Sequence, residues 1–522
     1  MPHVLTSSDR ARAQAQAGWR RLEHGVDAVC GSAGNPLRHL GALGFLLFWL
    51  LALCGIYLYA VLDTSAAGAW HSIDTLSREQ WFAGGVLRSV HRYAADAFVA
   101  VTLLHLGREW LFGRYTGFRR FTWLTGVPLL PLAFVCGIGG FWLNWDRLGQ
   151  FSAIATAEWL DALPLFASPL TRNFLGGASV GDRLFSLFVF VHLGVPLLLV
   201  FGLWFHVQRI SRAEVFPPRA LWLGTGLALL GLAALAPVQS QPPADLALAP
   251  ATLVLDWFLL FVHPLAYATS GRLLWALLGL ALLLLFALPF VSRCVAAPAV
   301  AVVDPAHCNG CRRCFDDCPY AAITMVPHPG GRPGRQLAEV RADLCASCGI
   351  CVGACPSSTP FRSLERLATG IDMPQQPIDA VRRRLLDGLA AMPTPRRHVV
   401  FGCARGARVD ALAAPDVLAL ELICTGMLPP SFVEYALRGG ADGVVVSGCV
   451  DGGCEFRLGT RWSEERLAGR REPHLRAAVP RERLRVVQAD AGQASLVAAA
   501  LDELRASAAP GGRERPALAV PS

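Results

Sequence analysis

Four histidines in two apolar segments constrain this chain more than any other feature. His91 and His105 share one segment, and His192 and His206 share another, with a spacing of fourteen residues in each pair. Fourteen residues are about four turns of an α-helix, so both histidines of a pair lie on one face, roughly 21 Å apart along the axis. A single histidine in an apolar stretch is usually a packing residue, but four at matched spacing are costly in a membrane and indicate function. Two such helices facing each other would offer two bis-histidine sites, which suit two b-type haems.

Long apolar runs occur only in the first 293 residues of this 522-residue chain, which is 53% hydrophobic with a mean hydropathy of +0.42. Each run is near the roughly 20 residues that a bilayer requires, so the pattern predicts an all-α transmembrane bundle. Segment 252–268 is also apolar enough to cross, and a seventh span there would place the C-terminal half on the opposite side of the membrane. The six spans that we expect are 41–60, 87–107, 123–143, 184–206, 220–238 and 272–292.

The distribution of arginine predicts the orientation. Arginines gather before the first expected span, between the second and third, and between the fourth and fifth, whereas residues 239–271 contain none. Arginine-rich loops stay on the cytoplasmic side. We therefore expect a multi-pass protein of the inner (cytoplasmic) membrane, whose polar segment 1–34 is cytoplasmic and is not a cleavable signal peptide. The net charge of +8 is not gathered in an aromatic–basic patch, which argues against nucleic-acid binding.

Three short runs surround the histidines: Gly85–Arg92 (GVLRSVHR), Thr122–Gly126 (TWLTG) and Gly140–Arg147 (GFWLNWDR). They resemble cytochrome b of the quinol-oxidising bc and bf complexes, over about residues 35–293, with a truncated C-terminal half. Glycines also recur at that family's spacing. Because glycine has no Cβ, a haem edge could approach the helix backbone there, although small residues also serve plain helix packing. These glycines are Gly41 with Gly55 and Gly126 with Gly140.

The topology assigns the four histidines to two haems. His91 and His192 begin their helices near the outer face and would hold an outer haem. His105 and His206 would hold an inner haem. Two arginines are placed to pair with haem propionates, or they anchor the helix at the membrane interface; these are Arg88 and Arg92.

The run Leu255–Phe258 (LDWF) follows a proline-rich loop, where the cytochrome b family carries its Pro-Glu-Trp-Tyr motif. That resemblance implies a short outer-surface helix, beside a quinol-oxidation site, that does not cross the membrane. Asp256 replaces the family's glutamate and could still accept a quinol proton. Trp145 stands in the earlier loop where the family has Pro-Trp, with Asn144 in place of the proline. The alternative is an amphipathic interfacial helix in which Asp256 is incidental.

Two copies of one cysteine pattern, CxxCxxCxxxCP, begin at Cys308 and Cys345. This is the bacterial two-cluster ferredoxin pattern, in which each [4Fe–4S] cluster takes its fourth ligand from the other copy. Zinc would not require the CxxxCP tails, and disulfides are rare on a cytoplasmic face. We expect an α+β dicluster ferredoxin domain at 299–362. Its first cysteine set is Cys308, Cys311, Cys314 and Cys355, and its second cysteine set is Cys345, Cys348, Cys351 and Cys318.

A linker at 363–396, with four prolines around a short Arg-rich helix, leads to a third domain at 397–506. Apolar runs at 398–402, 417–423, 443–447 and 484–488 alternate with helical stretches, which predicts a small parallel α/β sheet. Cysteines follow the first three runs, and the ends of parallel strands meet at one edge. Four thiols there could hold a [2Fe–2S] cluster or be buried and inert. This third cysteine set is Cys403, Cys424, Cys449 and Cys454; residues 507–522 are expected to be a disordered tail.

The runs Phe401–Cys403 (FGC), Ile423–Gly426 (ICTG) and Gly448–Cys454 (GCVDGGC) resemble the small iron–sulfur (delta) subunit of methyl-viologen-reducing hydrogenases. The resemblance implies that this domain exchanges electrons with the flavoprotein of a heterodisulfide-reductase-type complex. Many relatives have a second cysteine where this chain has Gly406, so only four cysteines remain here for the ligand set.

These features predict a membrane-bound electron-transfer subunit between the quinone pool and a cytoplasmic flavoprotein or other oxidoreductase. Electrons crossing the bilayer between haems would couple the transfer to membrane potential, at about 2.3 kcal/mol per charge per 100 mV, and either direction of flow is open. One alternative is a bc-type quinol oxidase core that works with a separate Rieske protein. The other is a non-catalytic membrane anchor for a soluble reductase. The resemblance to bc-type complexes also allows a homodimer.

Overall fold

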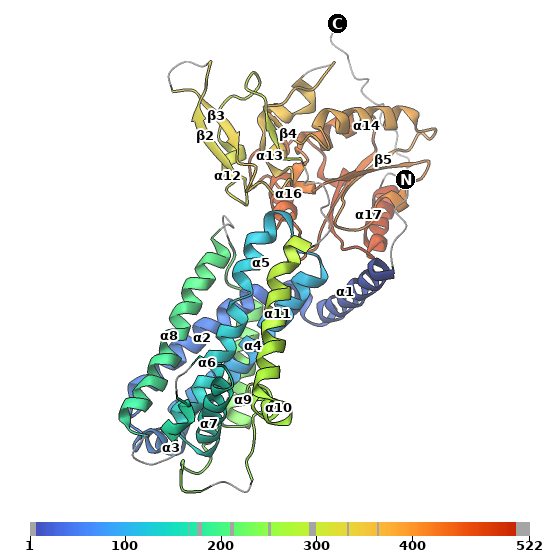
Figure 1. The fold of residues 1–522 in the computed structure, drawn as a ribbon. Helices are drawn as coiled ribbons and strands as arrows, with labels where there is room; N and C mark the ends of the chain where they lie inside the picture. Colours follow the sequence, from blue (N-terminus) through green and yellow to red (C-terminus); the bar gives the residue numbers. More distant parts are fainter. Residues whose placement is uncertain are drawn as a thin grey trace. The chain divides into compact units, whose positions relative to one another are not determined.

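The computed structural model describes residues 7–165, 168–174, 180–208, 213–248, 252–291, 299–330, 334–362 and 365–507 (Figure 1). The chain forms two compact units, one of Met1–Gln208 with Ala213–Arg293 and one made mainly of Cys294–Ser522. The expected disordered tail lies outside the described residues except for Ser507, the last residue of a helix.

Helices long and apolar enough to cross a membrane make up most of the first unit. Four of the described segments qualify by length and composition. The other two expected spans are also helical: α4 (Val86–Leu111) carries charged residues along its length, and α9 (Arg219–Leu235) is shorter. The four segments are α2 (Leu40–Val61), Gly117–Asn144, α8 (Asp182–Val207) and α11 (Gly271–Val291). The second of them is made of three consecutive elements, η3 (Gly117–Arg119), α5 (Arg120–Gly126) and α6 (Leu129–Asn144).

Helix α4 is central to the packing of this unit. It contacts α2, α6 and α9, while α8 packs against α5 and α6 (Figure 1). Ala94, Phe98 and Leu199 are among the buried side chains between these helices. The outward faces stay apolar, as with Phe190 and Leu197 of α8, which are 72% and 71% exposed. An exposed apolar surface of this kind marks a membrane or partner interface, and the unit is that of a membrane protein.

Segment 252–268 does not form a spanning helix. Residues 252–256 have no regular secondary structure, and the only helix is α10 (Val262–Ala268). Seven residues rise about 10 Å, too little to cross a bilayer. The prediction that this segment does not cross therefore agrees with the structure. The remaining short elements of the unit are η1 (Pro36–Arg38), α3 (Ala69–Glu79), the π-helix η2 (Trp81–Gly85), α7 (Arg147–Asp161) and η4 (Leu170–Phe174).

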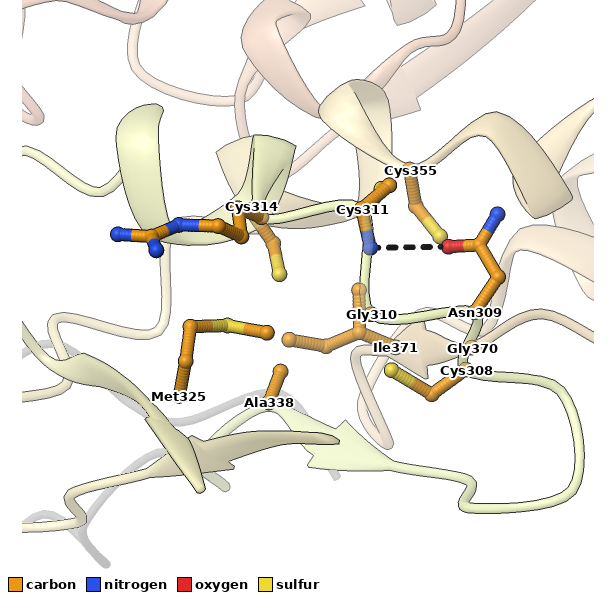
Figure 2. A pocket seen from close by; sticks show the side chains of 11 residues that line it. Cys308, Asn309, Gly310, Cys311, Cys314, Met325, Ala338, Cys355, Gly370 and Ile371 are labelled. Carbon is orange, nitrogen blue, oxygen red and sulfur yellow. Dashed lines mark hydrogen bonds between the residues drawn. The ribbon is translucent and has the colours of Figure 1, made fainter. Parts of the chain in front are cut away.

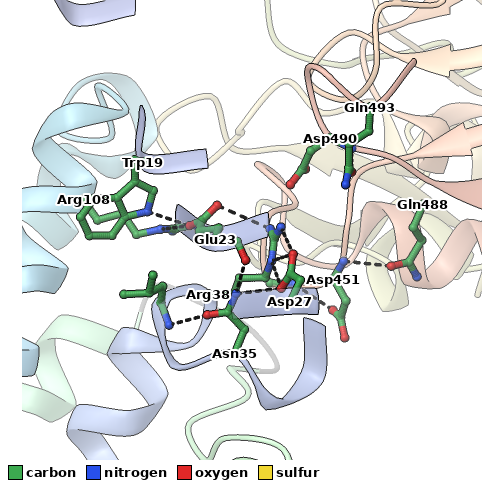
Figure 3. Close-up of polar contacts among 12 residues, drawn as sticks. Trp19, Glu23, Asp27, Asn35, Arg38, Arg108, Asp451, Gln488, Asp490 and Gln493 are labelled. Atoms are coloured by element: carbon green, nitrogen blue, oxygen red, sulfur yellow. Dashed lines mark hydrogen bonds and ion pairs between the residues drawn. The ribbon is translucent and has the colours of Figure 1, made fainter. Parts of the chain in front are cut away.

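The N-terminal helix α1 (Ser7–Gly34) is tied to the bundle by a buried charge network (Figure 3). Glu23 accepts a hydrogen bond from Trp19 Nε1 at 2.8 Å and pairs with Arg108 of α4 at 2.9 Å. Arg38, before α2, pairs with Asp27 at 2.6 Å. Glu23, Arg38 and Arg108 are only 2%, 5% and 6% exposed, so each charge depends on its partner.

The second unit begins with two small antiparallel pairs. Strands β2 (Ile323–Pro327) and β3 (Gln336–Val340) pair in one, and β1 (Val302–Val303) and β4 (Ile371–Asp372) pair in the other. Each copy of the cysteine pattern also contains a short helix, α12 (Arg313–Asp316) in the first and α13 (Ile350–Ala354) in the second.

The four apolar runs near the C-terminus form one parallel sheet in the order β6-β5-β7-β8. The two central strands are buried along their whole length, as expected of a parallel sheet covered on both faces. The strands are β5 (His398–Cys403), β6 (Val417–Leu422), β7 (Gly443–Gly448) and β8 (Leu484–Gln488); the helices are α15 (Ser431–Arg438), α16 (Gly459–Leu467) and α17 (Ala494–Ser507). The backbone N–H of Asp451, in the loop after β7, donates to Gln488 Oε1 at the end of β8 at 3.0 Å (Figure 3).

The segment predicted as a linker, 363–396, is folded over its described residues, 365–396. It contains β4 and α14 (Ile378–Ala391), and one face of α14 packs into the core that also holds Phe401 and Val433. The apolar residues of α14 recur at helical spacing, which gives the helix a buried face. These residues are Ile378, Val381, Leu385 and Leu389.

We predict that Arg108→Gln destabilises the first unit, because the substitution leaves Glu23 buried with fewer partners. Removing one partner of a buried pair costs about 3–5 kcal/mol, so the apparent melting temperature in detergent should fall by roughly 5 °C or more. Arg78→Gln is the matched control, since Arg78 pairs with Asp74 but its side chain is 73% exposed. Equal melting temperatures for the two variants would contradict the role given to this network.

Candidate haem and iron–sulfur sites

The structure brings the four predicted histidines together in two pairs. His91 of α4 faces His192 of α8 with ring centroids 6.4 Å apart, and His105 faces His206 at the same distance. Two imidazoles bound through nitrogen to opposite sides of one metal ion have centroids about 6 Å apart, because each metal–nitrogen bond is about 2 Å. The spacing therefore fits bis-histidine ligation at both levels.

Each histidine ring lies against a glycine of a neighbouring helix. A Cβ atom at Gly55 would lie 3.2 Å from His91 Cε1, and one at Gly140 would lie 3.1 Å from His192 Cε1. The same holds at the other level, for Gly41 with His105 (3.3 Å) and Gly126 with His206 (2.8 Å). We expected a haem edge at these glycines. In the structure an imidazole ring lies against each of these glycines, in the space that a Cβ would take.

A backbone carbonyl sets the orientation of one of the four imidazoles, that of His192. His192 Nδ1 lies 3.0 Å from the carbonyl oxygen of Cys136, four residues before Gly140. The carbonyls of Leu51 and Thr122, four residues before Gly55 and Gly126, interact with His91 and His206 in the same register, although neither Nδ1 has a well-aligned partner. An Nδ1–H that donates to a carbonyl leaves Nε2 free for a metal.

Cys136 is a residue that sequence reasoning missed. Taken as a scattered single cysteine, it has no evident role, yet its carbonyl holds His192 and its Sγ lies 3.9 Å from His192 Nδ1. The signal was present in its position four residues before Gly140, but it acts through the backbone, which side-chain patterns do not reveal.

The two arginines expected near haem propionates differ in their partners. Arg88 is buried and donates to Ser77 at 2.6 Å, Ser240 at 2.9 Å and Asn144 at 3.1 Å. These acceptors are all neutral. Arg92 instead forms ion pairs with Asp96, at 2.5 Å, and with Asp256, and its guanidinium lies over the Phe141 ring.

Asp256 and Trp145, the expected quinone-site residues, have different neighbours. Besides Arg92, Asp256 accepts hydrogen bonds from the backbone N–H groups of Phe258 at 3.1 Å and Leu259 at 2.8 Å. Trp145 caps α6 with a φ of +43° and packs against two phenylalanines, Phe185 and Phe188. Asp256 is therefore held by a cation and two backbone donors, while Trp145 lies in an apolar cluster.

The first cysteine set surrounds a small pocket (Figure 2). All four of its members line it, including Cys355 from the second copy of the pattern. Burial raises the pKa of the Cys314 thiol to about 12. A thiol in such a place stays protonated unless a metal binds its sulfur, and ligation then removes the proton.

The second cysteine set also converges across the two copies. The charge on Cys351 interacts with Cys348, Cys318 and Cys345, and also with Cys314 of the first set. Burial raises the pKa of Cys348 to about 12 and raises that of Cys351 further above its ordinary range. Cys355 thus lies with the first triplet and Cys318 lies near the second, while the two ligand sets stay a prediction from the duplicated pattern.

The third cysteine set meets at the carboxyl edge of the parallel sheet. The Cys449 thiol donates to Cys403 Sγ at 3.5 Å, and Cys424 and Cys454 complete a ring of four thiols. Hydrogen bonds from Cys424 and Cys449 lower the pKa of Cys403 to about 4, and the same interactions raise the pKa of Cys424 and of Cys449. Four converging thiols are a ligand set for a cluster or a single metal ion.

We predict that Gly126→Ala impairs the site of His206, because the new Cβ would lie 2.8 Å from the ring, closer than atoms pack. Haem content per protein, measured by the pyridine haemochrome method, should fall towards half of the wild-type value. Gly194→Ala in α8 is the control, since nothing lies within 4 Å of that position. Full haem content in the Gly126→Ala protein would show that the glycine does not set the ring position.

Comparison with known proteins finds similarity in three separate segments. Residues 30–213 match the family model for cytochrome b/b6/petB, residues 307–359 match a 4Fe-4S dicluster domain, and residues 401–509 match the methyl-viologen-reducing hydrogenase delta subunit. A solved chain of a hyperthermophilic respiratory Complex III is 21% identical, with a TM-score of 0.39, over 48% of this chain and 74% of that one. The matched segments support a membrane subunit of respiratory electron transfer that carries haem and iron–sulfur sites.

Proposed function

We propose that this chain carries electrons between the quinone pool and a cytoplasmic flavoprotein oxidoreductase. The route runs through two b haems, two [4Fe–4S] clusters and one [2Fe–2S] cluster. The observation that carries the proposal is the pairing of His91 with His192 and of His105 with His206 at one ring separation. Three cysteine sets on the same polypeptide extend this series of one-electron sites.

Each histidine pair holds one haem, with His91 and His192 at the outer level and His105 and His206 at the inner level. Haem supplies a one-electron couple when bound. The protein supplies the orientation of the His192 imidazole, through the carbonyl of Cys136, and the close helix approach at the glycines. Arg88 is the better candidate for a propionate, because its present partners are neutral. A propionate would give it a charge-assisted bond.

A quinone site beside Asp256 requires the Arg92–Asp256 ion pair to open. A carboxylate that pairs with a guanidinium and accepts two backbone N–H groups is a weak proton acceptor. Arg92 also pairs with Asp96, so it has a second carboxylate to hold it when Asp256 is released. In this proposal Asp256 accepts a proton from quinol, and Trp145 forms part of the apolar wall.

The cysteine sets connect the membrane part to a soluble partner on the cytoplasmic side. The hydrogenase delta-like segment supports a heterodisulfide-reductase-type flavoprotein as that partner. Electron transfer along this route can run in either direction. Membrane potential can drive electrons from quinol inward, or a low-potential donor can reduce quinone.

Anaerobic affinity purification from solubilised membranes, followed by mass spectrometry, tests the partner. A flavoprotein in the complex supports quinone-to-flavin transfer. A Rieske protein in its place would move the chemistry to the outer face and support the alternative of a bc-type quinol oxidase core. Iron and acid-labile sulfide are counted on the same sample. Ten of each per chain are expected in the clusters, beside the haem iron, and zinc at the cysteines would contradict the electron route.

We predict that His105→Ala and His192→Ala each remove one haem, because each substitution leaves a single imidazole at one level. The dithionite-reduced spectrum should keep about half of its b-type absorbance in either variant. Quinol should still reduce the remaining outer haem in His105→Ala, whereas electrons from quinol should not reach the iron–sulfur clusters. His71→Ala is the control, since His71 is exposed in α3. Full haem content in either test variant would show that the ligand assignment is wrong.

We also predict that Asp256→Asn slows reduction of the haems by quinol about 100-fold or more, because an amide cannot accept the proton. Asp256→Glu should stay within several-fold of the wild type, since a longer carboxylate keeps the function. Stopped-flow absorbance measures both rates, and haem content should be unchanged. A wild-type rate in the Asp256→Asn protein would remove Asp256 from the quinone site.

A further inference from the structure

The structure orders the three cysteine sets within the second unit. We propose that the third cysteine set exchanges electrons directly with the second set, and that the first set lies one step further along the route. This inference rests on the proposed function, because it concerns the clusters that the sets would hold. Each step moves one electron, so that one cluster is oxidised and its neighbour is reduced, with no bond made or broken and no proton transferred.

Helix α13, which carries Cys351, packs directly on η8 (Thr425–Met427), the turn that follows Cys424. Glycines on both sides allow this contact. A Cβ at Gly353 would collide with the carbonyl oxygen of Gly426, and one at Gly426 would lie 2.9 Å from Ile350 Cγ1. The backbones bearing the second and third sets are therefore in van der Waals contact.

Ile350 fills the space between the two sets. It is fully buried and directly precedes Cys351. Its Cδ1 would lie 3.7 Å from a Cβ at Gly459, a position that also borders Cys424 Sγ and Cys454 Sγ. The buried side chain of Ile350 thus reaches from the backbone beside Cys351 to the surroundings of Cys424 and Cys454.

A buried ion pair fixes the same junction from the other side. Arg466 of α16, which is 0% exposed, donates to the carbonyl of Gly426 at 2.8 Å and pairs with Asp317. Asp317 directly precedes Cys318 of the second set, and Arg471 also pairs with it, at 2.5 Å. A carboxylate held by two guanidinium groups in a buried place is rigid, because releasing it would leave uncompensated charge. The separation between the two sets is therefore fixed.

The first set has only an exposed contact with the α/β domain among the described residues: Arg313, which precedes Cys314, pairs with Glu472 at 3.3 Å, and the two side chains are 36% and 56% exposed. Its pocket is lined by residues between Cys308 and Ile371, among them Met325 of β2 and Ala338 of β3 (Figure 2). Within the described lining, no residue comes from the α/β domain that bears the third set. The first set is instead linked to the second, since α12, which carries Cys314, packs on α13, which carries Cys351. Because electron transfer slows steeply with distance, the favoured order is third set, second set, first set.

Electron paramagnetic resonance of the full-length, detergent-solubilised protein tests this order. Dithionite reduces all clusters, and the spin of the third-set cluster should be broadened and should relax fast because a paramagnetic neighbour is close. Cys351→Ser, which removes a second-set ligand, should abolish this enhancement. Cys314→Ser, the matched first-set change, should leave it in place. Enhancement that survives in Cys351→Ser and disappears in Cys314→Ser would overturn the order, and so would a third set that holds no iron.

A second variant keeps all ligands, in case loss of a cluster unfolds the unit. Gly353→Ala should push α13 away from Gly426 and weaken the spin interaction while iron and sulfide content stays at the wild-type value. Gly330→Ala is the control, since nothing lies within 4 Å of Gly330. An unchanged interaction in Gly353→Ala would contradict the junction. This spin measurement does not involve quinone. If it supports the order of the three cysteine sets but quinol fails to reduce the protein, the proposed function is refuted and the order still holds.

Discussion

The first unit depends on how closely four imidazole rings approach the backbones of neighbouring helices. Gly55 and Gly41 of α2 lie against His91 and His105 of α4, in reversed chain order. The spacing is fourteen residues on both helices, so an antiparallel pair meets at both levels at once. The same fourteen-residue spacing places Gly126 of α5 against His206 of α8, and Gly140 of α6 against His192 of α8. A shift of one residue in either pair would put side chains where the rings must lie.

The buried histidines and charged side chains of the bundle need polar partners within it. A histidine in an apolar bundle needs an acceptor for Nδ1, and for His192 the backbone carbonyl of Cys136 supplies it. Charged residues on α4 likewise find buried partners, as Arg108 does with Glu23 and Arg92 with Asp256. A charge taken out of water without a partner costs several kcal/mol, so the positions of Glu23 and Asp256 follow from those of the arginines.

In the second unit the controlling feature is the exchange of cysteines between the two copies of the pattern. Since Cys355 of the second copy lies with the first cysteine set and Cys318 of the first copy lies near the second set, neither copy assembles its four cysteines alone. The same compactness extends to the α/β domain, because α14 and the Arg466–Asp317 pair join it to the ferredoxin part. A segment rich in proline and arginine is therefore not free to act as a flexible connection.

Local spacing along the sequence determined much of this protein: the histidine pairs, the apolar helices, the duplicated cysteine pattern and the four strands of the parallel sheet. These are periodic or short-range signals, and backbone geometry converts them directly into faces and edges. The tertiary structure alone decided which distant residues are in contact. It paired Asp256 with Arg92, gave Cys136 a role through its carbonyl, folded α14 into a core and set Ile350 between two cysteine sets. Such contacts depend on the distance between residues far apart in the chain, which packing fixes and no local pattern encodes.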